Sequence, residues 1–165
     1  MKWIFIVAGL LILVIALIFI AGLLLPVSHT ATVSSIIPMP ATQAWTRLTD
    51  FSKYPEWRKN IKKVEVSSPD KWTETDDHND KIPYKMDLLE TGRKLRTEIV
   101  GDKLPFGGYW IIELKTVNND TEITITEYGK VFNPIFRALS KFVFGHDATI
   151  KNYLKYLTAS QALVQ

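Results

Sequence analysis

Residues 133–157 read NPIFRALSKFVFGHDATIKNYLKYL, and this stretch decides the fold. Asn133 is a favourable helix N-cap, and Pro134 suits the first helical position. Apolar side chains then recur at helical spacing, with basic residues on the opposite side. The apolar stripe comprises Ile135, Phe136, Leu139, Phe142, Val143, His146, Ile150, Tyr153, Leu154 and Leu157, and the basic side comprises Arg137, Lys141, Lys151 and Lys155. The pattern predicts one long amphipathic C-terminal helix, in which Gly145 permits a kink or the close approach of another segment.

The apolar stripe of this helix must be covered, and the alternating segments before it are the predicted cover. Residues 82–88 show the pattern well, because Ile82, Tyr84, Met86 and Leu88 alternate with more polar neighbours. The same reasoning predicts strands at 29–37, 61–67, 72–75, 82–88, 95–100, 109–114 and 122–127, with short helices at 41–50 and within 51–57. Short turns separate the strands from residue 61 onward, so the sheet is predicted to be an antiparallel meander. The expected class is α+β, with a curved sheet around the C-terminal helix.

The N-terminus carries a long apolar segment. Residues 3–25 contain no charged side chain, and a helix of this length spans about 35 Å, which exceeds a hydrocarbon core of about 30 Å. We expect an uncleaved membrane anchor over residues 1–27 and a folded domain over residues 28–165. The alternative is a cleaved signal peptide, but the run is longer than an h-region of about 7–15 residues and no A-x-A site follows.

Charges beside this segment predict its orientation. Lys2 and the α-amino group precede it, and no Lys or Arg follows until Arg47. The positive-inside rule then places the N-terminus in the cytoplasm and the domain on the extracytoplasmic side of a single-pass protein.

Composition excludes several classes of function. The chain has 20 basic and 17 acidic residues, a balance that argues against a dedicated nucleic-acid binder. It has no cysteine, which excludes disulfides, thiolate metal sites and a cysteine nucleophile. Three histidines and the absence of G-x-S-x-G, H-E-x-x-H, Walker or dinucleotide motifs give no reason to expect a metal or a cofactor, and they do not favour an enzyme.

Short motifs add a resemblance to a known family. Residues 50–57 match the pattern D-F-x-x-Y-P-x-W, and residues 104–110 match L-P-F-G-G-x-W. With the Asn-Pro at 133–134 and the Phe-Gly-His at 144–146, residues 28–157 resemble the START-like or SRPBCC superfamily. Within it, the chain is similar to bacterial proteins of the polyketide cyclase/dehydrase and lipid-transport type, although its membrane anchor departs from the best-known soluble members.

The resemblance implies a helix-grip fold, in which a seven-stranded antiparallel sheet curves around the C-terminal helix and encloses a cavity. Members bind lipids, sterols, polyketides or other apolar molecules there, and some are enzymes. The inward-facing positions expected to contact such a ligand are Tyr84, Met86, Leu88, Trp110, Ile112, Ile123, Ile125, Glu127, Phe136, Leu139 and His146.

Two of these residues are also weak candidates for catalysis. Alternation from Ile123 and Ile125 places Glu127 on the inner face, where it could act as a base or bind a ligand hydroxyl group. Helical spacing places His146 toward the sheet, where it could transfer a proton. The simpler interpretations are a hydrated carboxylate at the rim and a core histidine with a satisfied hydrogen bond.

Three hypotheses for function follow. The first is a membrane-anchored, non-catalytic module that binds a lipid-like or other hydrophobic small molecule between the sheet and the C-terminal helix. The second is an enzyme of the cyclase or dehydratase type that acts on a hydrophobic substrate. The third is an interaction domain with a vestigial cavity. The sequence predicts contact with a membrane through residues 3–25 and identifies no protein partner.

Overall fold

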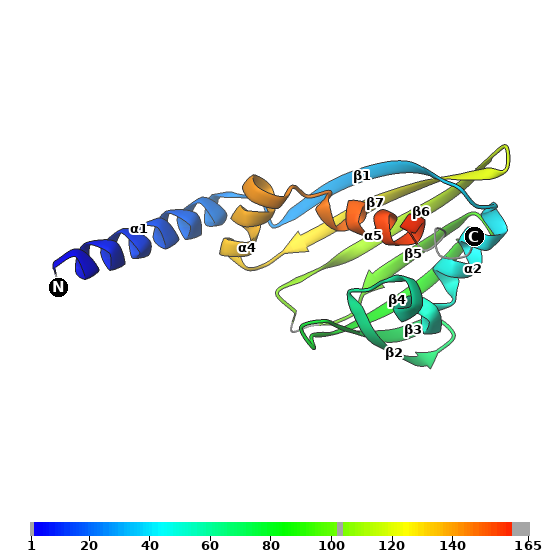
Figure 1. Cartoon of the computed structure of the whole chain (residues 1–165), viewed down its shortest axis with the longest axis horizontal. Helices are drawn as coiled ribbons and strands as arrows, with labels where there is room; N and C mark the ends of the chain where they lie inside the picture. The colour runs from blue at the N-terminus through cyan, green and yellow to red at the C-terminus, as the bar shows by residue number, and fades with distance from the viewer. Residues whose placement is uncertain (1, 102–103, 160–165) are drawn as a thin grey trace.

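A computed structural model describes residues 2–101 and 104–159 of the chain. Its centre is an antiparallel sheet of seven strands in the order β1-β7-β6-β5-β4-β3-β2 (Figure 1). The strands are β1 Ser28–Ile37, β2 Ile61–Ser68, β3 Lys71–Asp76, β4 Lys81–Glu90, β5 Lys94–Ile99, β6 Phe106–Val117 and β7 Asp120–Val131. The predicted α+β class and the antiparallel meander are confirmed. The first strand lies beside the last, with His29 opposite Gly129.

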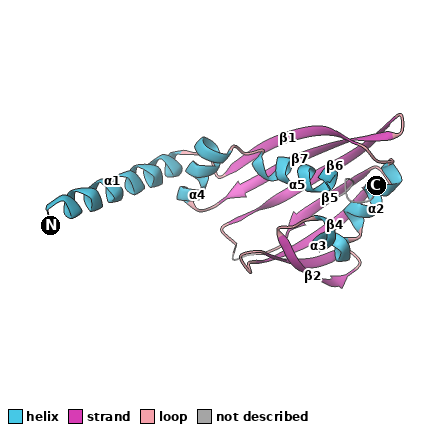
Figure 2. Cartoon of the chain, in the orientation of Figure 1, coloured by secondary structure: helices cyan, strands magenta, loops and turns pink. Residues whose placement is uncertain are grey.

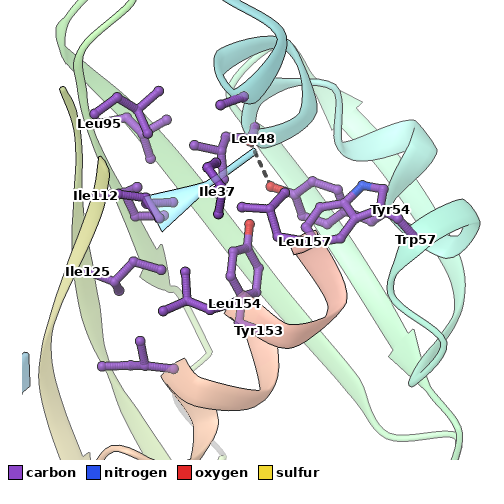
Figure 3. Close-up of a cluster of buried hydrophobic side chains, with 14 of the residues drawn as sticks. Ile37, Leu48, Tyr54, Trp57, Leu95, Ile112, Ile125, Tyr153, Leu154 and Leu157 are labelled. Carbon is purple, nitrogen blue, oxygen red and sulfur yellow. Dashed lines mark hydrogen bonds between the residues drawn. The ribbon is translucent and has the colours of Figure 1, made fainter. Parts of the chain in front are cut away.

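Short helices connect β1 to β2. Helix α2 spans Ala41–Thr49, a turn of 3-10 helix spans Phe51–Lys53, and α3 spans Tyr54–Trp57. The C-terminal helix α5, Ala148–Ala159, lies against the sheet (Figure 2). Its buried residues are Ile150, Tyr153, Leu154 and Leu157, and Figure 3 shows the last three in the core. Burying an aliphatic side chain of this size contributes about 1.5–3 kcal/mol, so α5 is held mainly by its apolar face.

The core lies between α5, the short helices and the inner face of the sheet. Figure 3 shows side chains from β1, β5, β6 and β7 meeting those of α2, α3 and α5. The hydroxyl of Tyr54 donates a hydrogen bond of 2.8 Å to the carbonyl of Leu48, which satisfies a polar group inside this apolar cluster.

The prediction of one continuous helix over residues 133–157 is wrong. The structure instead has α4 Pro134–Leu139, a π-helical turn at Ser140–Phe144, a break at Gly145, and then α5. Gly145 has φ +81° and ψ 145°, a conformation that only glycine adopts without strain, and it ends the first helical segment. The predicted N-cap is confirmed, because the Asn133 side chain accepts hydrogen bonds from the amides of Ile135 and Phe136.

Helix α4 packs against the N-terminal helix α1, Lys2–Leu24, and not over the sheet (Figure 1). Arg137, expected on the solvent side, is buried at 8% exposure, which corrects that expectation. Its guanidinium donates hydrogen bonds to the carbonyls of Gly22 and Leu25, at the end of α1, and to those of Val131 and Phe132. A helix C-terminus has unpaired carbonyls and a partial negative charge. Arg137 donates hydrogen bonds to these carbonyls, and its positive charge offsets the partial negative charge.

Gly22 permits this close packing. A side chain there would begin 1.8 Å from the carbonyl oxygen of Pro134, so only glycine fits between α1 and α4. Helix α1 itself is a candidate membrane span or signal sequence, with 23 residues and a mean hydropathy of 3.4. Its apolar surface is otherwise exposed.

Candidate functional site

A cavity of about 490 Å³ lies between the inner face of the sheet and the helices α3 and α5. This volume falls within the usual range of about 300–1,000 Å³ for small-molecule sites. All seven strands contribute to its wall, together with Thr149, Asn152, Tyr153 and Tyr156 of α5. The helix that grips the sheet is therefore also one wall of the cavity.

Aromatic rings form much of the wall. Trp72 is stacked between Phe51 and Tyr84, with ring centroids 4.0 and 5.3 Å away. Tyr153 contacts Trp110 edge to face at 5.3 Å. Rings packed in this way are rigid, so the wall is largely preformed for an apolar ligand.

A buried ion pair lies at one end of the cavity. The Arg58 guanidinium is 2.7 Å from Oε1 of Glu74, and it lies over the rings of Tyr54 and Tyr153 at 5.1 and 5.2 Å. Trp72 donates a second hydrogen bond of 3.0 Å to the same carboxylate oxygen. Burial raises the pKa of Tyr153 to about 12, so its phenol stays protonated and neutral at physiological pH.

Two cavity-lining residues near this ion pair carry a polar atom that has no partner among the described residues. The two atoms are Nε of Arg58 and Oδ1 of Asn60. An unpaired buried polar atom costs about 1–3 kcal/mol, so a hydrogen bond to either atom would stabilise this end of the cavity.

The other polar region joins β1 and β7. Glu127 Oε1 lies 3.6 Å from Nε2 of His29, and the His29 ring stacks on His146 with centroids 4.1 Å apart. Gly129 makes this approach possible, because a Cβ there would lie 2.4 Å from His29 and 2.9 Å from Glu127. Oε2 of Glu127 is buried without a partner among residues 2–101 and 104–159.

Burial sets the protonation of this region. It raises the pKa of Glu127 to about 7, against the opposing effect of a hydrogen bond from Trp110. Burial and the nearby His146 lower the pKa of His29. Burial, reinforced by Lys141, also lowers the pKa of His146, whose Nδ1 lies 3.1 Å from the Ser140 hydroxyl. Near neutral pH the carboxyl group can therefore either donate or accept a proton beside a neutral imidazole.

The structure distributes the eleven predicted ligand residues over several environments. Tyr84, Trp110, Ile112 and Glu127 line the cavity. Three others, Met86, Ile123 and Ile125, are buried in the core, and Leu88 is 52% exposed. The remaining three follow from the broken helix: Phe136 is exposed and Leu139 half-buried on α4, and His146 lies behind His29.

Four further cavity residues were not predicted from the sequence: His29, Arg58, Asn60 and Glu74. A usable signal existed for His29, because it lies two and four residues before Ala31 and Val33 and therefore shares their inward face of the strand. The pairing of Arg58 with Glu74 had no such signal, because it joins the end of α3 to a strand sixteen residues away. Among the described residues, no group of three or more histidine, aspartate or glutamate side chains is arranged to hold a metal ion.

Comparison with known proteins agrees with this architecture. Residues 28–152 match the family model described as polyketide cyclase / dehydrase and lipid transport. The chain belongs to this family, as the motifs at 50–57 and 104–110 suggested. A comparison with curated proteins gives no significant match.

Solved structures show the same fold. A START superfamily protein from Mycobacterium smegmatis is 13% identical, with a TM-score of 0.68 over 83% of this chain and 99% of that chain. A conserved protein from Geobacillus kaustophilus is 16% identical, with a TM-score of 0.67 over 81% and 95%. The di-domain ARO/CYC BexL from the BE-7585A biosynthetic pathway is 10% identical, with a TM-score of 0.68 over 82% and 47%. Identities this low show the fold alone.

Proposed function

We propose that this protein is a membrane-anchored, non-catalytic module that binds a lipid-like or other hydrophobic small molecule. The observation that carries the proposal is the cavity of about 490 Å³ between the sheet and α5, with its stacked aromatic wall. The family's description, which includes lipid transport, supports the same ligand class. Hydrophobic burial supplies most of the affinity in a site of this kind.

The ligand in this proposal is amphipathic. Arg58, Asn60 and Glu127 line the cavity and each carries a buried polar atom without a partner among the described residues, so a wholly apolar ligand would leave these atoms unsatisfied. A ligand that carries a hydroxyl or carbonyl group satisfies at least one of them while its apolar part contacts Trp110 and Tyr84.

The anchor in this proposal is α1, retained in the mature protein. Residues 3–25 are longer than a signal-peptide core, and α1 is joined to the domain through Arg137. Lys2 on its N-terminal side favours an extracytoplasmic domain. Because the chain has no cysteine, single cysteines at Lys2 and at exposed Glu65 can be labelled with an impermeant maleimide in intact cells. Labelling only at position 65 supports this orientation, and labelling only at position 2 reverses it.

Ligand binding is tested with the full chain purified in a nonionic detergent. The bound lipids are extracted and identified by mass spectrometry, and a fluorescent fatty acid is then titrated. Thr97→Trp places a large ring in the cavity and should abolish binding. Thr126→Trp is the matched control, because Thr126 lies on the outer face of β7, where its hydroxyl contacts Thr32. Equal binding by the two variants contradicts the proposal.

A second function has one specific observation in its favour. Glu127, with a pKa of about 7, lies beside neutral His29 at the cavity wall. Such a pair could serve as the acid and base of a cyclase or dehydratase. The structure connects Glu127 to His146 through His29 and not directly. The test is mass spectrometry of the extracted ligand after incubation with the native chain or with Glu127→Gln. Conversion by the native chain alone supports an enzyme.

A further inference from the structure

We propose that residues 132–144, here called the docking segment, insert into the surface of the bilayer that α1 spans. This inference rests on the proposed membrane anchor and goes beyond it, because it assigns a second membrane contact to the folded domain. The occupant of the surface is a lipid bilayer with anionic headgroups.

The docking segment exposes an unusual concentration of large apolar side chains. Phe132 and Phe136 are 50% and 54% exposed, and Phe142, Val143 and Phe144 are 64–68% exposed. The π-helical turn presents the last three consecutively, so none of them packs into the core. Outside α1, the other exposed large apolar residues of the described chain are scattered over several strands and loops. A clustered apolar surface of this kind marks a site of contact with another apolar phase.

The position of the docking segment identifies that phase as the bilayer. Arg137 lies within the segment and bonds to the carbonyls of Gly22 and Leu25 at the end of α1. The apolar run over 3–25 spans about 35 Å, so its last turn lies near the headgroup boundary of a hydrocarbon core about 30 Å thick. Since α4 packs on Gly22 in that turn, Phe136 of α4 lies near this boundary, and the π-helical turn with Phe142 and Phe144 follows directly after α4.

The charge of the segment fits an anionic membrane surface. No aspartate or glutamate occurs between Glu127 and Asp147, whereas Lys130, Arg137 and Lys141 lie in this interval. Arg137 is used in the contact with α1, but Lys130 and Lys141 are exposed. Phenylalanines flanked by exposed lysines are typical of segments that lie in the interface of a membrane.

Docking would bring the cavity close to the lipids. Val131 lines the cavity, and the next residue, Phe132, is the first exposed residue of the docking segment. The amide of Phe132 donates to the carbonyl of Pro105, beside cavity-lining Phe106. A hydrophobic ligand would therefore pass between the cavity and the adjoining leaflet over a short path.

The insertion is tested with the full chain in nanodiscs that each hold one copy, made of phosphatidylcholine and phosphatidylglycerol. Phe142→Cys is labelled with bimane, and the nanodiscs carry lipids with a doxyl quencher near the top of the acyl chain. Val66→Cys is the matched control, because Val66 is an exposed apolar residue on β2, the opposite edge strand from β1. We expect a loss of bimane emission at position 142 and none at position 66.

Equal emission at the two positions, with the chain still held in the nanodisc, overturns the proposal. The same label is also measured in vesicles that hold several copies of the chain. If the label at position 142 is shielded only there, the occupant is a second copy, and the proposal is overturned. Release of the chain from the nanodisc shows instead that the anchor itself has failed, and the fatty-acid titration in detergent reports separately on the cavity.

A second pair of variants tests the consequence for ligand exchange. Phe142→Ser combined with Phe144→Ser should slow the transfer of the fluorescent fatty acid from vesicles to the full chain, while its affinity in detergent stays unchanged. Ile36→Ser combined with Val66→Ser removes two apolar side chains that are each 50% exposed and should leave the transfer rate unchanged. Equal transfer rates for the two double variants would refute direct exchange with the leaflet.

Discussion

Replacing Glu127 by glutamine should make the protein more stable at alkaline pH and remove part of its pH dependence. Burial raises the pKa of this carboxyl group from 4.5 to about 7, and its side chain is only 17% exposed. Each unit of pKa is worth about 1.4 kcal/mol, so ionising the folded protein costs about 3 kcal/mol relative to ionising the unfolded chain.

The direction of the pH dependence is set by the proton bound to Glu127. Between pH 4.5 and about 7 the unfolded chain has released the proton of Glu127 while the folded chain retains it, so the free energy of unfolding falls as the pH rises. His29 and His146 contribute in the opposite direction, because their pKa values are lowered and their stabilisation is lost as the pH falls. The comparison with Glu127→Gln isolates the carboxyl group, since both proteins keep the two histidines.

The assay is urea unfolding of the full chain in a nonionic detergent, followed by tryptophan fluorescence from about pH 4 to about pH 8. We expect the stability of Glu127→Gln, measured relative to the native chain, to increase by about 3 kcal/mol across this range. Glu122→Gln is a control, because Glu122 lies on the same strand and pairs with Lys115 at the surface. Parallel pH curves for the native chain and Glu127→Gln would show that Glu127 ionises normally, and would refute our account of the site.

Three further changes test the helical segments. Arg137→Met leaves buried carbonyls without their donor and should lower the free energy of unfolding by about 2 kcal/mol or more, with faster hydrogen exchange in α4. Asn133→Ala should cost about 1 kcal/mol in urea unfolding, whereas Asn133→Asp should be nearly neutral because it keeps the capping oxygen. Gly145→Ala should cost about 1–3 kcal/mol, because alanine at φ +81° is strained; an unchanged urea midpoint would contradict this.

Most of the sheet could be predicted because each strand carries its own evidence. The alternation of Ile82, Tyr84 and Met86 is local, and it indicates a strand whatever that strand pairs with. Short turns then indicate the antiparallel order of β2 to β7. The same alternation placed Tyr84, Trp110 and Glu127 at what is the cavity wall.

The rest of the site depends on contacts between distant segments. His29 meets Glu127 only because β1 pairs with β7, which begins more than eighty residues later in the chain. Their closeness also requires Gly129, whose missing side chain leaves room for the imidazole. A sequence pattern shows which face a residue occupies but not which neighbour shares it, so the sequence could place His29 on the inner face but not beside Glu127.

The broken C-terminal helix shows the same limit in another form. Its apolar stripe continues across Gly145 at helical spacing, and periodicity alone cannot show that the two halves pack against different partners. Ile150 and Leu157 in the second half are buried against the sheet, whereas Phe136 and Phe142 in the first half remain exposed, and α4 packs against α1.

The break also explains why the stripe is so long. A continuous helix over residues 134–159 would extend about 39 Å in one direction and could follow either the sheet or the end of α1. With the break at Gly145, α5 covers the core and the cavity, while α4 turns to α1 and is held there by Arg137. One amphipathic stretch thus serves two apolar partners. If the second partner is the bilayer, the phenylalanines of α4 and the π-helical turn need no cover from the protein.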